Sequence, residues 1–466
     1  MQKRYFIHTF GCQMNEHDSA RMGESLLKAG WVPADAAESA DLVLLNTCAI
    51  REKAEDKLYS ALGRYRMVKA QRGARIGVAG CVAQQEKEGL LGRAPYVDFV
   101  LGPDQIGRIV ELAEQGGVET GWVPSEEYVF LQADPEGSRG KATAFVLAMK
   151  GCDNVCSFCV VPHTRGREVS RPYAEIVREV AALCSVGVRE VTLIGQNVNS
   201  YAGGCSFAQL IRRVAAVPDL RRIRFTTSHP MDLSPELVEC FRDVDKLMPH
   251  FHLPVQHGAD AVLERMRRRY TIAEYERRVA SLFAACPDVA LTSDIICGFP
   301  GETEQEHQQT LALLRRIPYD NLFSFVFSER PHTAAALRLS QERKAAQRSP
   351  EWREVSRPVA TRRLEEVQQL QQARTLGRHR SCVGADVEVL VESARTAPGV
   401  SGERFGRSRE NWTVHFAGAS AVGDLVRVRV EKAGLVALVG AEAAVIDPTA
   451  HRIAPLPRTR LAVLSA

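Results

Sequence analysis

The stretch Gly151-Cys-Asp-Asn-Val-Cys-Ser-Phe-Cys-Val160 places Cys152, Cys156 and Cys159 in one short loop. This CxxxCxxC spacing offers three thiolates and no fourth. A structural zinc site is closed by four ligands in a tetrahedron, so a partial zinc site or a chance group of cysteines is the weaker interpretation. A 4Fe-4S cluster held by only three thiolates keeps one iron open for another ligand. The spacing therefore predicts such a cluster.

Length and composition indicate an ordinary multidomain globular protein. The 466 residues are 45% hydrophobic and 25% charged, which suffices for about three domains with cores of their own. The net charge of +4 permits a nucleic-acid partner without requiring one. Twelve cysteines in so long a chain do not indicate a secreted disulfide scaffold. Residues 1–10 have no signal-peptide pattern and no run of 18 apolar residues occurs, so we expect a cytoplasmic protein without a membrane span.

The N-terminal region, residues 1–130, alternates short apolar strands with helices. This alternation predicts an α/β domain with an open parallel sheet. A turn-rich segment, residues 131–141, is expected to be a linker. We expect strands at 5–10, 42–46 and 76–79, and helices at 16–29, 52–69 and 105–112.

The strand–helix alternation resumes in residues 142–375, where six β/α units predict a partial (β/α)6 TIM-type barrel with its site at the C-terminal ends of the strands. Residues 376–445 change to short alternating strands, which predict a small β-barrel, and residues 446–466 form a tail. The expected barrel strands are 144–149, 190–194, 222–226, 250–253, 290–296 and 321–327, and the expected helices include 174–185, 207–214 and 361–376.

Three further cysteines share a position in the N-terminal pattern. Cys12, Cys48 and Cys81 each follow one of the three expected strands. Because the carboxyl ends of parallel strands meet at one edge of a sheet, these side chains can converge, and helix N-termini there stabilise thiolates. Each cysteine alone would be interpreted as a small buried apolar side chain. The matched placement instead predicts a second metal site.

With Phe158 before its third cysteine, the loop resembles the signature of the radical S-adenosylmethionine (radical SAM) enzymes. Together with residues 9–14, 45–54, 80–84 and 150–172, it makes the chain similar to the radical SAM methylthiotransferases over roughly residues 4–440. The segment Asn46-Thr-Cys-Ala-Ile-Arg-Glu-Lys-Ala54 is most similar to the MiaB-type tRNA branch. The resemblance implies an N-terminal methylthiotransferase domain, a radical SAM partial barrel and a C-terminal TRAM β-barrel.

The resemblance also implies the cofactors and the reaction. Two 4Fe-4S clusters are implied, one on Cys152, Cys156 and Cys159 and the other on Cys12, Cys48 and Cys81, and no catalytic residue beyond these cysteines is predicted. The implied reaction is methylthiolation of carbon-2 of N6-isopentenyladenosine at position 37 of tRNA. No side chain can attack an unactivated aromatic C–H bond, so the cofactors carry the difficult step. One S-adenosylmethionine would be cleaved to open that bond, and a second would donate a methyl group to cluster-bound sulfur.

Two groups of residues are predicted to bind cofactor and RNA. The residues expected to hold S-adenosylmethionine are Gln196, Ser228, Arg268 and Gly298. Arg268 could neutralise a carboxylate or belong to a solvated basic face. The segment 404–412 interleaves arginines with aromatics, as RNA sites do, although a hairpin with solvated charges has the same composition. The residues that the resemblance marks as RNA contacts are Arg404, Arg407, Arg409 and Trp412.

The expected partners are the anticodon arm of tRNA and an electron donor such as a flavodoxin or ferredoxin, and we expect a monomer that does not bind membranes. Two other functions stay open. A related methylthiotransferase would act on threonylcarbamoyladenosine in tRNA or on an aspartate of a ribosomal protein, but the residues after Cys48 disfavour both. A non-catalytic iron–sulfur protein that binds RNA is disfavoured by the complete cysteine loop and barrel.

Overall fold

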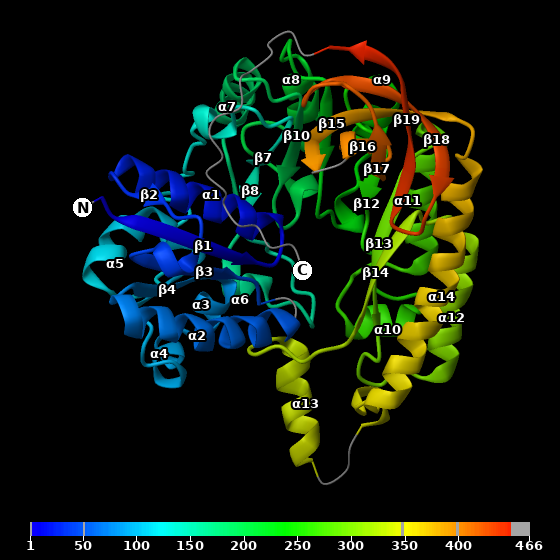
Figure 1. The fold of residues 1–466 in the computed structure, drawn as a ribbon. Helices are drawn as coiled ribbons and strands as arrows, with labels where there is room; N and C mark the ends of the chain where they lie inside the picture. The colour runs from blue at the N-terminus through cyan, green and yellow to red at the C-terminus, as the bar shows by residue number, and fades with distance from the viewer. Residues whose placement is uncertain (1, 50–51, 346–348, 398–399, 449–466) are drawn as a thin grey trace.

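The N-terminal region is a parallel sheet with helices on both faces (Figure 1). The computed structural model describes residues 2–49, 52–345, 349–397 and 400–448. Helices α1 and α5 pack on one face of the sheet, and α2 and α4 pack on the other. In sheet order, the strands are β2 (Val32–Pro33), β1 (Arg4–Phe10), β3 (Leu42–Thr47), β4 (Arg75–Gly80), β5 (Phe99–Leu101) and β6 (Gly117–Glu119). The α-helices are α1 (Gln13–Lys28), α2 (Glu52–Arg72), α3 (Cys81–Glu86), α4 (Glu88–Arg93) and α5 (Ile109–Gln115).

The open parallel sheet is therefore as predicted, with two differences. The helix expected at 105–112 is divided into a 3-10 turn, η2 (Pro103–Arg108), and α5, because Pro103 starts a tight turn at the end of β5. The short strands β2, β5 and β6 were not predicted, since two or three residues are too few to show a period.

The second region is an open barrel of six parallel strands. Two three-stranded sheets, β7-β10-β11 and β12-β13-β14, are linked by a bridge between Ile223 and Leu247. This arrangement confirms the predicted partial barrel, and β7 and β14 are its edge strands. The strands are β7 (Thr143–Leu147), β10 (Glu190–Ile194), β11 (Arg222–Phe225), β12 (His250–His252), β13 (Ala290–Cys297) and β14 (Asn321–Val326). The helices that follow them are α7 (Tyr173–Ser185), α8 (Phe207–Ala215), α9 (Pro235–Asp243), α11 (Ile272–Ala285), α12 (Glu304–Arg316) and α14 (Arg357–Ser381).

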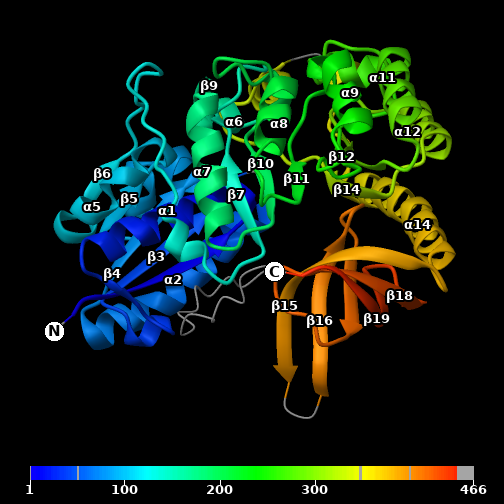
Figure 2. The ribbon, with the colours of Figure 1, turned by 90° about the horizontal axis from the view of Figure 1, so that it is seen from above.

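Shorter elements surround the barrel mouth, and a small closed barrel ends the described chain. The shorter elements are β8 (Met149–Lys150), β9 (Val169–Ser170), α6 (Val161–Arg165), α10 (Asp260–Arg265) and α13 (Ala334–Lys344). The closed barrel has the order β15-β16-β17-β19-β18 and lies beside α14 (Figure 2), and it also contacts β11 of the open barrel. Its strands are β15 (Asp386–Ala397), β16 (Val400–Ser408), β17 (Thr413–Ala417), β18 (Leu425–Ala433) and β19 (Ala437–Asp447).

The domain limits stay a prediction. Helix α14 runs without a break through the expected boundary between residues 375 and 376, and most of the expected tail, residues 449–466, lies outside the described residues. Among the described residues, every helix is too short or too polar to cross a membrane.

Candidate functional site

The CxxxCxxC loop lies between β8 and α6 and is held by the barrel. The Ser157 hydroxyl donates to the carbonyl of Arg265 (2.7 Å), and the Ser157 amide donates to the carbonyl of Met266 (3.0 Å). Gly151 begins the loop with a positive φ of 73°, and a Cβ there would lie 2.0 Å from the Arg167 carbonyl oxygen. Only glycine therefore permits this entry into the loop.

Burial disfavours the thiolate form of two of the loop cysteines, Cys152 and Cys159. Desolvation raises the pKa of Cys159 to about 12 and also raises the pKa of Cys152. A neutral thiol is stable in such surroundings, and three thiolates are not, unless a cation balances their charge. The loop therefore fits a metal cluster, whose binding would release the thiol protons.

Arg268 is not part of a solvated basic face, because its guanidinium is buried at the loop. It donates to the Sγ of Cys156 (3.4 Å), to the carbonyl of Pro254 (2.8 Å) and to the hydroxyl of Tyr270 (3.0 Å). Its direct partners are therefore a loop thiol, a strand-end carbonyl and a tyrosine hydroxyl. Its contact with a cofactor carboxylate stays a prediction.

The other three residues predicted to hold S-adenosylmethionine lie at strand ends. The Gln196 side chain accepts a hydrogen bond from the Gly151 amide and so supports the cysteine loop. The Ser228 hydroxyl is buried and has no hydrogen-bond partner within the described chain. Gly298 donates its amide to Glu302, and a Cβ on Gly298 would lie 2.5 Å from the Cβ of Ala360. Packing against α14 therefore explains the glycine, whatever else its backbone binds.

The ends of β10 and β11 offer unsatisfied polar groups to a ligand. Besides Ser228, the buried Asn197 oxygen Oδ1 has no hydrogen-bond partner in the described residues. The two loops are joined by the hydrogen bond from the Val198 amide to the Thr227 carbonyl (2.9 Å). Buried polar groups are nearly always satisfied in a complete site. This pair therefore fits a polar cofactor such as S-adenosylmethionine.

Cys12, Cys48 and Cys81 lie together at the carboxyl edge of the N-terminal sheet, as predicted. Cys12 is the N-cap residue of α1, Cys48 follows β3, and Cys81 is the first residue of α3. A hydrogen bond with the Cys48 thiol is the main cause that lowers the pKa of Cys12 to about 6, against the opposing effect of burial. A Cβ on Gly11 would lie 2.5 Å from the Cβ of Cys48, so glycine allows this close approach. Three grouped thiols fit a second cluster.

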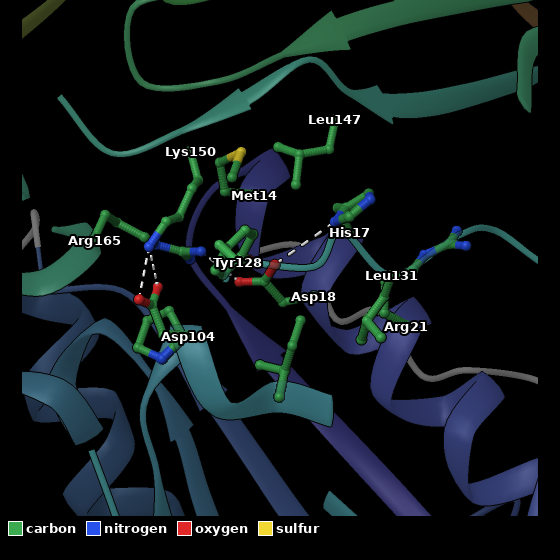
Figure 3. Close-up of a pocket in the computed structure, with 12 residues that line it drawn as sticks. Met14, His17, Asp18, Arg21, Asp104, Tyr128, Leu131, Leu147, Lys150 and Arg165 are labelled. Atoms are coloured by element: carbon green, nitrogen blue, oxygen red, sulfur yellow. Dashed lines mark hydrogen bonds and ion pairs between the residues drawn. The ribbon is translucent and has the colours of Figure 1, made fainter. Parts of the chain in front are cut away.

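A residue of the open barrel joins this second cysteine group. Arg165, the last residue of α6, donates from Nε to the Sγ of Cys81 (3.2 Å) and from Nη1 to Asp18 on α1 (2.6 Å). Beside it, Lys150 forms a buried ion pair with Asp104 (2.6 Å). Figure 3 shows the Lys150–Asp104 pair next to Arg165 and Asp18. The cavity that these residues line has a volume of about 10 Å³, room for about one water molecule. The two elements that flank the CxxxCxxC loop, β8 and α6, are thus joined directly to the N-terminal domain that carries the second cysteine group.

The Cys12 loop also reaches the mouth of the barrel. The Thr226 hydroxyl, at the end of β11, donates to the Gln13 side chain (3.1 Å). Met14 packs with Leu147 of β7 in one apolar cluster, to which Cys12 is adjacent. The second cysteine group therefore lies at the C-terminal ends of the barrel strands, the edge where the CxxxCxxC loop also begins.

Replacing Arg165 by glutamine is expected to destabilise the apoprotein by about 3–5 kcal/mol, because the Asp18 carboxylate would stay buried without its partner. Burial alone would raise the pKa of Asp18, but Arg165 and His17 outweigh it and lower that pKa. Chemical denaturation of the apoprotein measures the loss. The control is Arg167→Gln, since the Arg167 side chain is 83% exposed and exposed ion pairs contribute little. Asp18→Asn should partly rescue Arg165→Gln, and equal stability of the two single arginine variants would contradict the expectation.

The segment 404–412 forms the β16–β17 hairpin, and most of its predicted RNA-binding side chains have partners within the chain. Arg404 donates to the Ser420 carbonyl (2.7 Å), and Arg407 lies 3.7 Å from Glu392. The Trp412 ring contacts Arg378 and His379 of α14. Arg409 is the exposed member of the four.

Buried arginines of the barrel fix this hairpin. The guanidinium of Arg224 donates to the carbonyls of Ser408 (2.7 Å) and Arg409 (3.0 Å), and Arg222 donates to the Arg407 carbonyl (2.9 Å). Arg222, Arg224 and Asp18 were not predicted from the sequence. Arg165 was expected to face a cluster or an RNA phosphate, but its partner Cys81 was not predicted. Arginines at alternate positions of the otherwise apolar strand β11 were a signal for Arg222 and Arg224. No local sequence pattern, however, predicts a partner on a distant element.

Comparison with protein families matches residues 4–102 to the uncharacterized protein family UPF0004 and residues 146–314 to the radical SAM superfamily. The chain is 60% identical over 439 residues to a protein of Anaeromyxobacter sp. (strain K), covering 93% of this chain and 92% of that protein. It is 55% identical over 461 residues to a protein of Myxococcus xanthus (strain DK1622), covering 98% and 97%. Both are named tRNA-2-methylthio-N(6)-dimethylallyladenosine synthase.

Among solved structures, the fold is similar to the radical S-adenosylmethionine methyltransferase TsrM from Kitasatospora setae, which has cobalamin and a [4Fe-4S] cluster bound. The TM-score is 0.55 at 15% identity, with 75% of this chain and 80% of that chain covered, so this likeness concerns the fold alone. The family is decided by the two curated relatives: the chain belongs to the tRNA-2-methylthio-N(6)-dimethylallyladenosine synthases, within the radical SAM superfamily.

Proposed function

We propose that this chain converts N6-dimethylallyladenosine beside the tRNA anticodon to its 2-methylthio derivative. The observation that supports this most is the arrangement of two three-cysteine groups at the mouth of one barrel, tied together by Arg165 and by the hydrogen bond between Thr226 and Gln13. A reaction that opens a C–H bond and then adds sulfur needs both centres near one base. The curated relatives carry the name of that activity.

In this proposal each cysteine group holds a 4Fe-4S cluster. When bound, the cluster on Cys152, Cys156 and Cys159 supplies the reductive cleavage of S-adenosylmethionine, and the cluster on Cys12, Cys48 and Cys81 supplies a place for the transferred sulfur. Arg268 keeps Cys156 in position through its Sγ contact and its hydrogen bond to Pro254. Ser228 and Gln196 are proposed to line the S-adenosylmethionine site, with the backbone of Gly298 at its border.

The RNA contact of the terminal barrel is proposed to depend chiefly on Arg409. If Arg409 binds a phosphate, Arg409→Gln should flatten the slope of log K against log salt by about 0.7–0.9, because one fewer counterion is released. Filter binding of an anticodon stem-loop over a salt series measures the slope. Arg277→Gln is the control, since Arg277 is also exposed but lies on the outer helix α11. An unchanged slope for Arg409→Gln would move the RNA contact away from the hairpin.

Arg404, Arg407 and Trp412 are proposed to act with Arg409 only if they exchange their internal partners for RNA. Further proposals follow from the family. The electron donor is a flavodoxin or ferredoxin, and the protein acts as a monomer in the cytoplasm on the anticodon arm.

Mass spectrometry of tRNA nucleosides tests the function directly. Cells that lack the chain should accumulate N6-dimethylallyladenosine, and cells that regain it should contain the 2-methylthio derivative. The matched control regains a chain with Cys152, Cys156 and Cys159 replaced by alanine. A methylthio group on threonylcarbamoyladenosine, or on a ribosomal protein instead of tRNA, would favour the related enzymes. No difference between the strains would contradict catalysis on tRNA.

A further inference from the structure

The concave inner face of the open barrel is lined by alternate residues of its strands. Phe225, Phe251 and Leu322 pack into or against the core between strands and outer helices. Successive side chains of a strand point to opposite faces. The residues next to these three on each strand therefore project inward. On the last three strands these inward residues include His252 on β12, Asp294 on β13, and Phe323 and Phe325 on β14.

Other parts of the chain already cover much of this inner face. At β7, Leu147 packs with Met14 from the N-terminal domain. At β11, Thr226 is hydrogen-bonded to Gln13, while Arg222 and Arg224 bind the backbone of the terminal hairpin. The N-terminal domain therefore covers the barrel at β7, and the terminal barrel covers it at β11.

The wall formed by β12, β13 and β14 is different, because its aromatic side chains face solvent. Phe323 is 45% exposed and Phe325 is 38% exposed. The His252 ring meets Phe323 edge-on at 5.8 Å between centroids. His252 also has an acidic neighbour, because its Nε2 atom lies 3.6 Å from the Asp294 carboxylate. Large apolar side chains that stay exposed on a concave face are typical of a ligand-binding surface.

This wall leads to the cysteine loop. Phe327, two residues beyond Phe325, packs against the same apolar cluster as Phe158 of the CxxxCxxC loop. Pro254, two residues beyond His252, accepts the hydrogen bond of Arg268, which also contacts Cys156. A ligand on the wall would thus reach the loop at one end, and the Cys12 loop borders the same mouth from the opposite edge.

We propose that His252, Phe323 and Phe325 form the subsite for the N6-dimethylallyl group of the target adenine. The inference rests on the proposed function and adds how the substrate is selected. A five-carbon apolar substituent leaves water most favourably against exposed aromatic rings. The Asp294 carboxylate at the border can accept the remaining N6–H of the prenylated base, and it would repel a substituent that carries a carboxylate, as threonylcarbamoyl does.

The test compares two anticodon stem-loops of identical sequence, one with the dimethylallyl group on the target adenine and one without it. Their dissociation constants are measured on the full-length protein with both clusters reconstituted. Wild type should prefer the prenylated stem-loop. Phe323→Ala and Phe325→Ala should each reduce this preference by about 10-fold, the scale on which small apolar groups are discriminated by a pocket, and should leave the affinity for the unmodified stem-loop unchanged.

Two controls separate loss of the subsite from loss of the fold. Phe323→Leu keeps an apolar side chain and should retain most of the preference. Leu337→Ala removes an exposed apolar side chain from α13, outside the wall, and should change nothing. An unchanged preference in both alanine variants, or equal weakening for both stem-loops, would overturn the proposal. Methylthio product is measured in parallel. Wild type that prefers the prenylated stem-loop but forms no such product would contradict the proposed function and leave the subsite supported.

Discussion

Replacing Cys152, Cys156 and Cys159 together by alanine is expected to halve the iron of the reconstituted protein and to abolish formation of 5′-deoxyadenosine. Two 4Fe-4S sites correspond to about eight irons per chain, and the variant should hold about four. The fold should survive, because the loop is anchored by Ser157 and by the hydrogen bond between Gly151 and Gln196, neither of which uses a cysteine. Iron analysis and chromatography of the reaction products measure the two effects.

A matched control removes a cysteine that belongs to neither group. Cys286 lies at the C-terminal end of α11, and Cys286→Ala should retain both the iron and the 5′-deoxyadenosine activity. Wild-type protein that binds about one metal ion per chain would indicate a zinc-like site and contradict the expectation. Undiminished 5′-deoxyadenosine in the triple variant would do so too.

The fold was predictable wherever a strand is long and its neighbours are turns. Strand β3 is six consecutive buried residues, Leu42–Thr47, and such a run is typical of a central parallel strand. Residues 386–391 and 425–430 alternate as barrel strands do, and both lie in strands of the closed barrel. The grouping of the six cysteines could also be predicted. Spacing within a loop and position after parallel strands do not depend on how the domains pack together.

Contacts between distant elements were not predictable in the same way. Nothing near Arg165 in the sequence indicates that its guanidinium reaches Cys81 and Asp18, since that contact depends on how α6 docks on the N-terminal sheet. Trp412 has the neighbours of an RNA-stacking residue, but α14 supplies Arg378 and His379 as its ring partners. The aromatic wall of β14 has a strand period in the sequence, yet only the barrel decides which face of that strand stays exposed.

Replacing Cys12 or Cys48 by alanine is expected to stop formation of the methylthio product while 5′-deoxyadenosine formation continues. The reason is that both residues belong to the N-terminal sheet, whereas the CxxxCxxC loop is held by barrel residues such as Arg265 and Arg268. The variants should retain about half of the iron, about four per chain, in the barrel cluster. Both products are quantified from one reaction with S-adenosylmethionine, a reductant and prenylated tRNA.

Cys81→Ala is the informative third variant, because Cys81 is the cysteine that Arg165 contacts across the domain boundary. Loss of its thiol removes one hydrogen bond from Arg165 but leaves the stronger ion pair with Asp18, so the barrel loop should keep its place and 5′-deoxyadenosine should still form. If all three variants lost both activities equally while the barrel cluster stayed intact, the two cysteine groups could not have separate tasks. If Cys81→Ala alone lost both, Arg165 would couple the second site to the first.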